Sequence, residues 1–149
     1  MELVIRKMTE SDLEQLYRLL SDQRVMEYIE APYTREKTEQ FLQRAGLAEV
    51  PLIYAAEKDG EFIGYVIYHD YDKDSVEIGW ILYPECWGKG YASALTEMMI
   101  EKTSFSGKQA VIECSPMQQI TKHIAKKYGF AYEGRIDHCD VFRRKSENA

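Results

Sequence analysis

The stretch from Val76 to Tyr83 constrains the fold more than any other part of the chain. Successive side chains of a β-strand point to opposite faces of the sheet. One face of this stretch carries Val76, Ile78, Trp80 and Leu82, and the other carries Glu77, Gly79, Ile81 and Tyr83. Both sets are largely apolar, which is typical of a strand that is covered on each side. We therefore expect a central strand, ended by Pro84, with structure packed on both faces of its sheet.

The remaining sequence alternates between strand-like and helix-like periodicity. Strands are predicted over 3–8, 52–57, 62–69, 110–114, 130–136 and 141–142, and helices over 13–20, 24–28, 34–45, 88–103 and 120–128. The order is a strand, helices, a three-strand meander, a helix, a strand, a helix and a hairpin. This order predicts one mixed α/β domain over residues 1–149, with the charged tail 143–149 frayed.

Composition argues against several kinds of partner. The chain has 25 acidic and 19 basic residues, a net charge of −6, which disfavours generic nucleic-acid binding. No apolar run approaches the roughly 18 residues of a membrane span, and the start lacks the layout of a signal peptide. The three cysteines are an odd number without CxxC spacing, so neither a disulfide framework nor a zinc site is indicated. We expect a metal-free, cytoplasmic protein that binds neither nucleic acid nor membranes.

The charge is divided unevenly along the chain. Residues 1–74 hold 16 acidic and 9 basic residues, a net charge of −7, whereas residues 75–149 hold 9 and 10, a net charge of +1. A polyanionic ligand would bind more readily to the second half, and a cationic ligand to the first half.

Gly88-Lys89-Gly90 follows the central strand and stands where the next helix begins. A helix N-terminus offers unpaired N–H groups and the positive end of the helix dipole, and glycine lets a phosphate approach the backbone closely. Lys89 adds a positive charge. The Walker A pattern is absent, and Ser93 stands where a dinucleotide fingerprint has its third glycine. These residues predict a phosphate-binding loop of another kind.

The run W-G-K-G-Y-A at 87–92 resembles the acetyl-CoA motif of the GNAT family of N-acetyltransferases, (Q/R)-x-x-G-x-(G/A). Trp87 takes the Gln/Arg position, Gly90 the glycine and Ala92 the last small residue. The Trp variant is typical of the branch with the RimJ/RimL-like ribosomal-protein N-terminal acetyltransferases. Segments 25–41, 77–92 and 127–134 are similar to that branch in the same order. The resemblance implies a twisted, mostly antiparallel sheet of six to seven strands with helices on both faces.

The resemblance also implies a set of residues that bind acetyl-CoA. These are the backbone of Ile81 and Leu82, which would pair with the pantetheine arm, the helix start at Trp87, Gly88, Lys89, Gly90, Tyr91, Ala92 and Ser93, and Gln118, which takes the place of the family's asparagine. A backbone N–H, that of Leu82, would polarise the thioester carbonyl. Lys122 and Lys126 either reach the cofactor's 3′-phosphate or form a solvated face.

Glu77 is the candidate general base for the amine, because it lies on the central strand in apolar surroundings that raise a carboxyl pKa. A structural carboxylate paired with a nearby cation is the other reading of Glu77. Many relatives place a tyrosine general acid four residues before the glycine that corresponds to Gly129, and here that position is Ala125. The resemblance therefore supplies a base and leaves the proton donor unidentified.

The acceptor groove of the family lies between the 25–34 loop and the final hairpin, which makes Tyr28, Tyr33 and His138 the candidate acceptor residues. We expect acetyl transfer to a primary amine by direct attack, the amine being a protein N-terminus or a small cationic molecule. The other readings are a non-catalytic acyl-CoA-binding module and, on Gly-Lys-Gly alone, a domain for another nucleotide. Many relatives dimerise, so a homodimer is also open.

Overall fold

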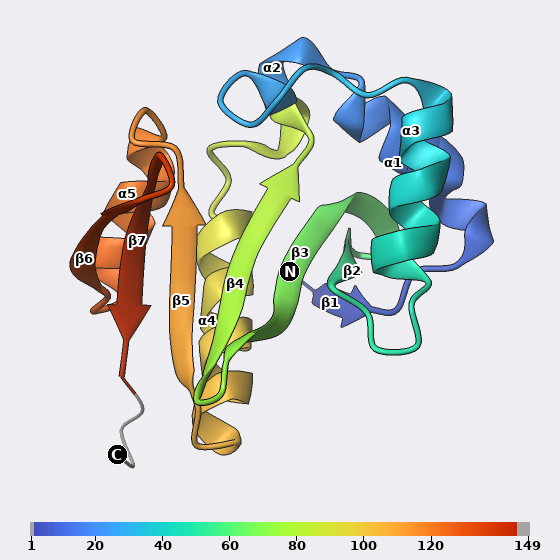
Figure 1. Ribbon diagram of the computed structural model, residues 1–149. Helices are drawn as coiled ribbons and strands as arrows, with labels where there is room; N and C mark the ends of the chain where they lie inside the picture. The colour runs from blue at the N-terminus through green and yellow to red at the C-terminus, as the bar shows by residue number, and fades with distance from the viewer. Residues whose placement is uncertain (1, 146–149) are drawn as a thin grey trace.

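A computed structural model describes residues 2–145 as a seven-stranded sheet flanked by helices (Figure 1). The strands are β1 (Leu3–Arg6), β2 (Ile53–Lys58), β3 (Glu61–Asp72), β4 (Ser75–Leu82), β5 (Gln109–Cys114), β6 (Ala131–Ile136) and β7 (Cys139–Arg144). The helices are α1 (Leu13–Leu20), α2 (Gln23–Met26), α3 (Arg35–Phe41), α4 (Tyr91–Phe105) and α5 (Gln119–Lys127), with single turns at Glu10–Asp12, Leu42–Gly46 and Pro84–Cys86.

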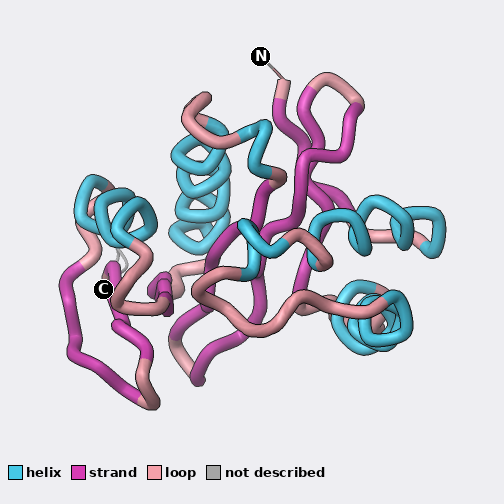
Figure 2. Tube along the Cα trace, turned by 90° about the horizontal axis from the view of Figure 1, so that it is seen from above, coloured by secondary structure: helices cyan, strands magenta, loops and turns pink. Residues whose placement is uncertain are grey.

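The strand order is β1-β2-β3-β4-β5-β7-β6, and β4 with β5 is the parallel pair among antiparallel ones. Seen from above, helices lie on both sides of the strands (Figure 2). The expected architecture, a mostly antiparallel sheet of six to seven strands covered on both faces, is thus confirmed.

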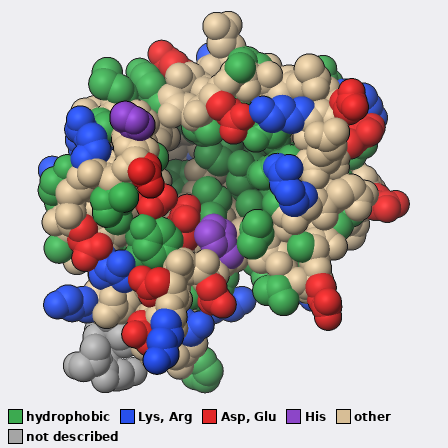
Figure 3. All heavy atoms as spheres, in the orientation of Figure 1, with side chains coloured by type: hydrophobic (Ala, Val, Ile, Leu, Met, Phe, Trp, Pro, Cys, Tyr) green, Lys and Arg blue, Asp and Glu red, His purple; other side chains and the backbone are tan. Residues whose placement is uncertain are grey.

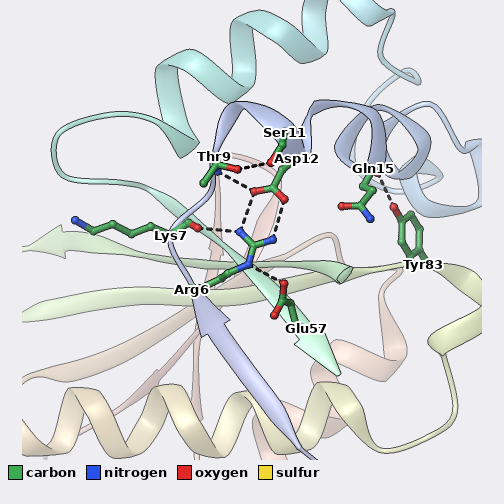
Figure 4. A network of polar contacts seen from close by, with 8 residues as sticks. All are labelled: Arg6, Lys7, Thr9, Ser11, Asp12, Gln15, Glu57 and Tyr83. Atoms are coloured by element: carbon green, nitrogen blue, oxygen red, sulfur yellow. Dashed lines mark hydrogen bonds and ion pairs between the residues drawn. The ribbon is translucent and has the colours of Figure 1, made fainter. Parts of the chain in front are cut away.

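The central strand β4 is buried on both sides, as its sequence predicts. Ile78 and Leu82 belong to the cluster formed with α4, where Leu95 and Met99 are fully buried. Tyr83 belongs to a second cluster, formed with α1 and α3 on the opposite face. Its hydroxyl donates to the carbonyl of Gln15 (2.7 Å) and ties the end of β4 to α1 (Figure 4). Two separate cores therefore hold this strand in place.

The pairing of β4 with β5 stops early. The register joins Ser75 with Gln109, Val76 with Ala110 and Glu77 with Val111. Beyond Glu77 the two strands diverge toward their carboxyl ends (Figure 1). The edge of β4 that faces β5 therefore keeps backbone N–H and C=O groups that the sheet does not pair, from Ile78 onward. Such groups are available to a ligand.

The charged tail differs from our prediction. Arg143 and Arg144 do not fray but form the end of β7, paired with Val111 and Ala110 of β5. The Arg143 guanidinium donates to Glu133 (2.9 Å) on β6 and lies 3.5 Å from Asp72. These ion pairs extend the hairpin further than the apolar pattern alone indicates. Residues 146–149 of the predicted tail lie outside the described part of the chain.

A buried ion pair joins β1 to the turn before α1 (Figure 4). Arg6 holds Asp12 through two parallel bonds of 2.8 and 2.9 Å and reaches Glu57 on β2 through Nε (2.7 Å). The Thr9 N–H also donates to Asp12 (2.8 Å), whose side chain is only 4% exposed. Burial by itself raises the pKa of Asp12, but the bonds from Arg6 and Thr9 outweigh it and hold the pKa below its usual value.

Replacement of Asp12 by Asn should lower the free energy of unfolding at pH 7 by about 2 kcal/mol, because the Arg6 guanidinium loses a buried charged partner. A carboxyl whose pKa is lower in the folded protein than in the unfolded chain stabilises the fold at any pH above its pKa in the unfolded chain. This stabilisation is lost as the pH falls through its pKa in the folded protein. The difference between the variant and the wild type in urea unfolding should therefore shrink in acid. Glu57→Gln, which breaks a single bond at a more exposed site, should cost less; an equal cost would contradict this account.

Candidate active site

A cavity of about 600 Å³ opens at the carboxyl end of β4, where β4 and β5 have diverged. Its lining comes from four segments: 24–29 in and after α2, 80–82 on β4, 86–93 at the start of α4, and 117–127 in and before α5. Elements that are far apart in the sequence thus meet around one space, whose volume is in the range of small-molecule sites.

The loop between β4 and α4 forms one wall of this cavity. The Trp87 indole N–H donates to the Leu82 carbonyl (3.0 Å) and fixes the loop to the end of β4. Gly88 and Gly90 have φ angles of 74° and 84°, a backbone conformation that a residue with a Cβ adopts at a cost. Gly90 is the N-cap of α4 and provides no capping side chain. The first N–H groups of a 15-residue helix therefore face the cavity and suit an anion.

Most of the predicted cofactor residues lie around this cavity. Those that line it are Ile81, Leu82, Trp87, Gly88, Gly90, Tyr91, Ala92, Ser93 and Gln118. Lys89 is exposed on the outside of the loop and does not line the cavity. Gln118 accepts the Ser115 N–H (2.9 Å), so its side chain also shapes the turn between β5 and α5.

Lys126 is exposed and does not line the cavity, in agreement with the alternative of a solvated face, whereas Lys122 has a structural role. Lys122 is bound to the buried Asp140 (3.3 Å) and to the Pro116 carbonyl (3.3 Å), so it serves the fold and does not line the cavity. Arg24, His123 and Lys127 do line it. The sequence could not distinguish these residues from an ordinary charged surface, because the packing of α5 on β7 decides which of its basic side chains is used.

Glu77 lies on the face of the sheet that carries α1 and α3, in a part of that face that the two helices leave open. Figure 3 shows a hollow in this face, with hydrophobic side chains at its bottom and acidic and histidine side chains beside it. Burial raises the pKa of Glu77, a protonated His69 opposes the rise, Glu113 adds to it, and the pKa ends above its usual value. Glu77 Oε1 is 3.6 Å from His69 Nε2. A carboxylate in these surroundings accepts protons more readily than an exposed one.

Glu113 provides a second carboxylate on the same face, from β5. The Tyr71 hydroxyl donates to Glu113 (2.7 Å), and this bond, together with burial, raises the pKa of Tyr71 to about 12. Glu113 stands two residues beyond Val111, the last residue of β5 that pairs with β4. Glu113 therefore lies on β5 where β4 and β5 begin to separate, and Glu77 lies on β4 at the same place.

The predicted acceptor residues are only partly brought together. Tyr28 lines the cavity. Tyr33 packs edge-on against Phe41 and donates to Glu30 (3.1 Å), away from the cavity lining. His138 lies in the turn between β6 and β7, exposed, and also outside the lining.

The family's usual proton donor has no counterpart in α5. Ala125 is fully buried in the core against the sheet. Tyr128, the tyrosine nearest to it in sequence, donates to Glu97 of α4 (3.0 Å) and does not line the cavity. The tyrosines that do line the cavity are Tyr28 and Tyr91.

The sequence analysis missed His69, Tyr71 and Glu113. The sequence did indicate that residues 69 and 71 would share one face of a strand if that strand extended past residue 69. The missing information was the register, in which His69 is directly opposite Glu77 and the strand runs on to Asp72.

Comparison with known proteins gives the family. Residues 2–131 match the family described as "Acetyltransferase (GNAT) domain". An uncharacterized N-acetyltransferase of Bacillus subtilis (strain 168), YnaD, is 28% identical in an alignment of length 144 that covers 92% of this chain and 84% of that protein. An acetyltransferase (GNAT family) from Bacillus anthracis has a TM-score of 0.81 at 26% identity, with 96% of this chain and 93% of that chain covered.

A second similar structure is the ribosomal L7/L12 alpha-N-protein acetyltransferase RimL in complex with coenzyme A. Its TM-score is 0.83 at 18% identity, with 99% of this chain and 96% of that chain covered. This chain belongs to the GNAT acetyltransferase family. It is an N-acetyltransferase whose acetyl donor is acetyl-CoA.

Two features are absent from residues 2–145. No helix there has the length and apolar character needed to cross a membrane. No group of three or more His, Cys, Asp or Glu side chains in the same range is arranged to hold a metal ion.

Replacement of Trp87 by Phe should weaken the binding of acetyl-CoA and of CoA about fivefold. The variant keeps an aromatic ring but loses the bond to the Leu82 carbonyl, and one such bond is worth about 1 kcal/mol. Calorimetric titration measures the change, with ATP as the control ligand that should bind to neither protein. Unchanged CoA affinity in a normally folded variant would show that the indole N–H does not hold the loop.

Proposed function

We propose that the protein transfers the acetyl group of acetyl-CoA directly to a primary amine that enters from the open face of the sheet. The observation that carries this proposal is the divergence of β4 and β5 after Glu77, because the cavity lies at the carboxyl end of β4 and the two carboxylates lie where the divergence begins. A cofactor in the cavity and an amine on the open face would meet where the two strands separate.

The cavity suits acetyl-CoA for two reasons. The unpaired backbone edge of β4 near Ile81 and Leu82 offers the pantetheine amides the partners that a neighbouring strand would offer. The uncapped N–H groups at the start of α4, with Lys127 also on the cavity lining, offer the pyrophosphate and the 3′-phosphate positive charge. The Leu82 N–H would polarise the thioester carbonyl.

Glu77 acts as the general base in this proposal. Along an extended strand, Glu77 is about 13 Å from Ile81 at roughly 3.3 Å per residue. This separation is more than one water molecule spans, so a chain of water molecules relays the proton from the amine. The raised pKa of Glu77 makes its carboxylate a stronger base than an ordinary one.

The proton balance is simple. The acceptor arrives as an ammonium and gives one proton to Glu77. Its nitrogen attacks the thioester carbon, the C–S bond breaks, and the new amide nitrogen loses a second proton. One proton ends on the CoA thiol and one leaves to solvent. These reaction steps need no covalent intermediate between the acetyl group and the protein.

A cationic small molecule is the acceptor that we propose. Glu77 and Glu113 are both acidic, and Arg143, the nearest cation of β7, is engaged with Glu133 and Asp72. The net charge of −7 over residues 1–74 adds to the attraction of a cation. A protein N-terminus carries a single positive charge at the reacting nitrogen and gains less from a second carboxylate.

We also place the protein in the cytoplasm. Cys86, Cys114 and Cys139 are all unpaired, and thiols persist in reducing compartments. The non-catalytic acyl-CoA-binding module would keep the cavity but give no reason for a buried carboxylate with a raised pKa, so we do not propose it.

Replacement of Glu77 by Gln should reduce kcat about 10²–10³-fold and leave the affinity for acetyl-CoA unchanged, because the base is lost and the cavity is not. A carboxyl with a raised folded pKa destabilises the fold once the pH is high enough to ionise it. The variant should therefore be at least as stable as the wild type at pH 8. Thiol release and thermal unfolding measure the two effects. Full activity in the variant would remove Glu77 from the mechanism.

Polyamines and aminoglycosides should be acetylated with a higher kcat/KM than a peptide whose single positive charge is its N-terminal amine. Replacement of Glu113 by Gln should raise KM for the polycation about tenfold, equivalent to one charge contact, with kcat changed by less than about threefold. The peptide should show little change. A preference of the wild type for the peptide would contradict the proposed acceptor class.

A further inference from the structure

We infer that His69 and Glu77 form one proton-accepting pair, in which the imidazole holds the proton that the acceptor amine gives up through Glu77. This inference rests on the proposed role of Glu77 as the base and adds a positioning residue to it. The two side chains come from adjacent strands, β3 and β4, and the register places their Cα atoms directly opposite each other.

The orientation of the imidazole is fixed from its other side. His69 Nδ1 is 2.9 Å from the Asp70 carbonyl oxygen. A carbonyl only accepts hydrogen bonds, so Nδ1 carries the hydrogen and Nε2 of the neutral ring has a free lone pair. Nε2 is the atom that faces Glu77 Oε1, at 3.6 Å. This tautomer is therefore ready to take a proton on the side of the carboxylate.

The separation of 3.6 Å is that of two interacting groups and is longer than a hydrogen bond. Catalytic hydrogen bonds are often long in a free enzyme and shorten when the substrate is bound. Both side chains are mostly withdrawn from solvent, with 26% of His69 and 19% of Glu77 exposed. A proton shared between them is consequently not lost to bulk water as readily as one on an exposed group.

The charged and titratable groups that act on the pair or lie next to it come from β3, β5 and β7. Glu113 of β5 and Tyr71 of β3 are bound to each other, and Cys139 and Arg143 come from β7. Arg143 is held by Glu133 and Asp72. Glu113 is thus the neighbour whose negative charge acts on the pair most directly.

The chemical advantage of the pair lies in where the proton stays. A carboxylate alone would hold the proton of an ammonium poorly, because amines are far stronger bases. Histidine is the side chain whose charge changes between pH 5 and 8. With His69 the proton rests between Oε1 and Nε2 as an ion pair, and the carboxylate stays ionised next to the incoming amine.

The experiment is the pH dependence of kcat/KM for the wild type and for His69→Gln. Glutamine can donate an amide N–H to Glu77 but cannot take up a proton. The acidic limb of the profile should move to lower pH by about one unit or more, kcat should fall about tenfold to a hundredfold, and KM for acetyl-CoA should stay within about twofold. His69→Asn, whose amide can still donate to the Asp70 carbonyl, is the second variant if the first does not fold.

Asp70→Asn is the matched control, because it removes an exposed carboxylate next to His69 and keeps the carbonyl that holds Nδ1. Its profile should equal that of the wild type. If Glu77→Gln is inactive and the acidic limb of His69→Gln does not move, the pair is refuted and Glu77 remains the base. If Glu77→Gln is fully active, the proposed base fails, and the pair fails with it.

Discussion

β4 pairs with β3 along nearly all of its length and with β5 over only three residue pairs. Two cores hold it at the same time, one beneath α4 and one beneath α1 and α3. Because both cores anchor the strand, its separation from β5 beyond Glu77 does not depend on a ligand being present. The cavity, the open helix start and the carboxylates all take their positions from this one strand.

The charges are divided between the two sides of the split in a way that suits the reaction. The side of the cavity carries the uncapped start of α4 and Lys127, and attracts an anion. The open face carries Glu77 and Glu113 and attracts a cation. A donor that bears phosphates and an acceptor that bears ammonium groups are therefore drawn to different sides, and they approach each other only where β4 and β5 separate.

Much of this arrangement could be predicted from the sequence, because local rules fix it. The two apolar faces of 76–83 predicted the central strand, and the glycines at 88 and 90 predicted the loop before α4. The rest depends on long-range pairing. His69 faces Glu77 only through the β3–β4 register, and Lys122 serves Asp140 only because α5 packs near β7. The ordered Arg143 depends on Glu133 and Asp72, which local charge patterns do not reveal.

The most direct test of the account is to follow the backbone amides of the ¹⁵N-labelled protein by NMR while CoA is added. If the cofactor occupies the space between the diverging strands, the amides of β4 from Ile78 to Leu82 and those of Tyr91, Ala92 and Ser93 should shift together with one dissociation constant. If CoA binds and these two groups of amides stay unchanged, the cofactor lies elsewhere, and the split between β4 and β5 is not the site of acetyl transfer.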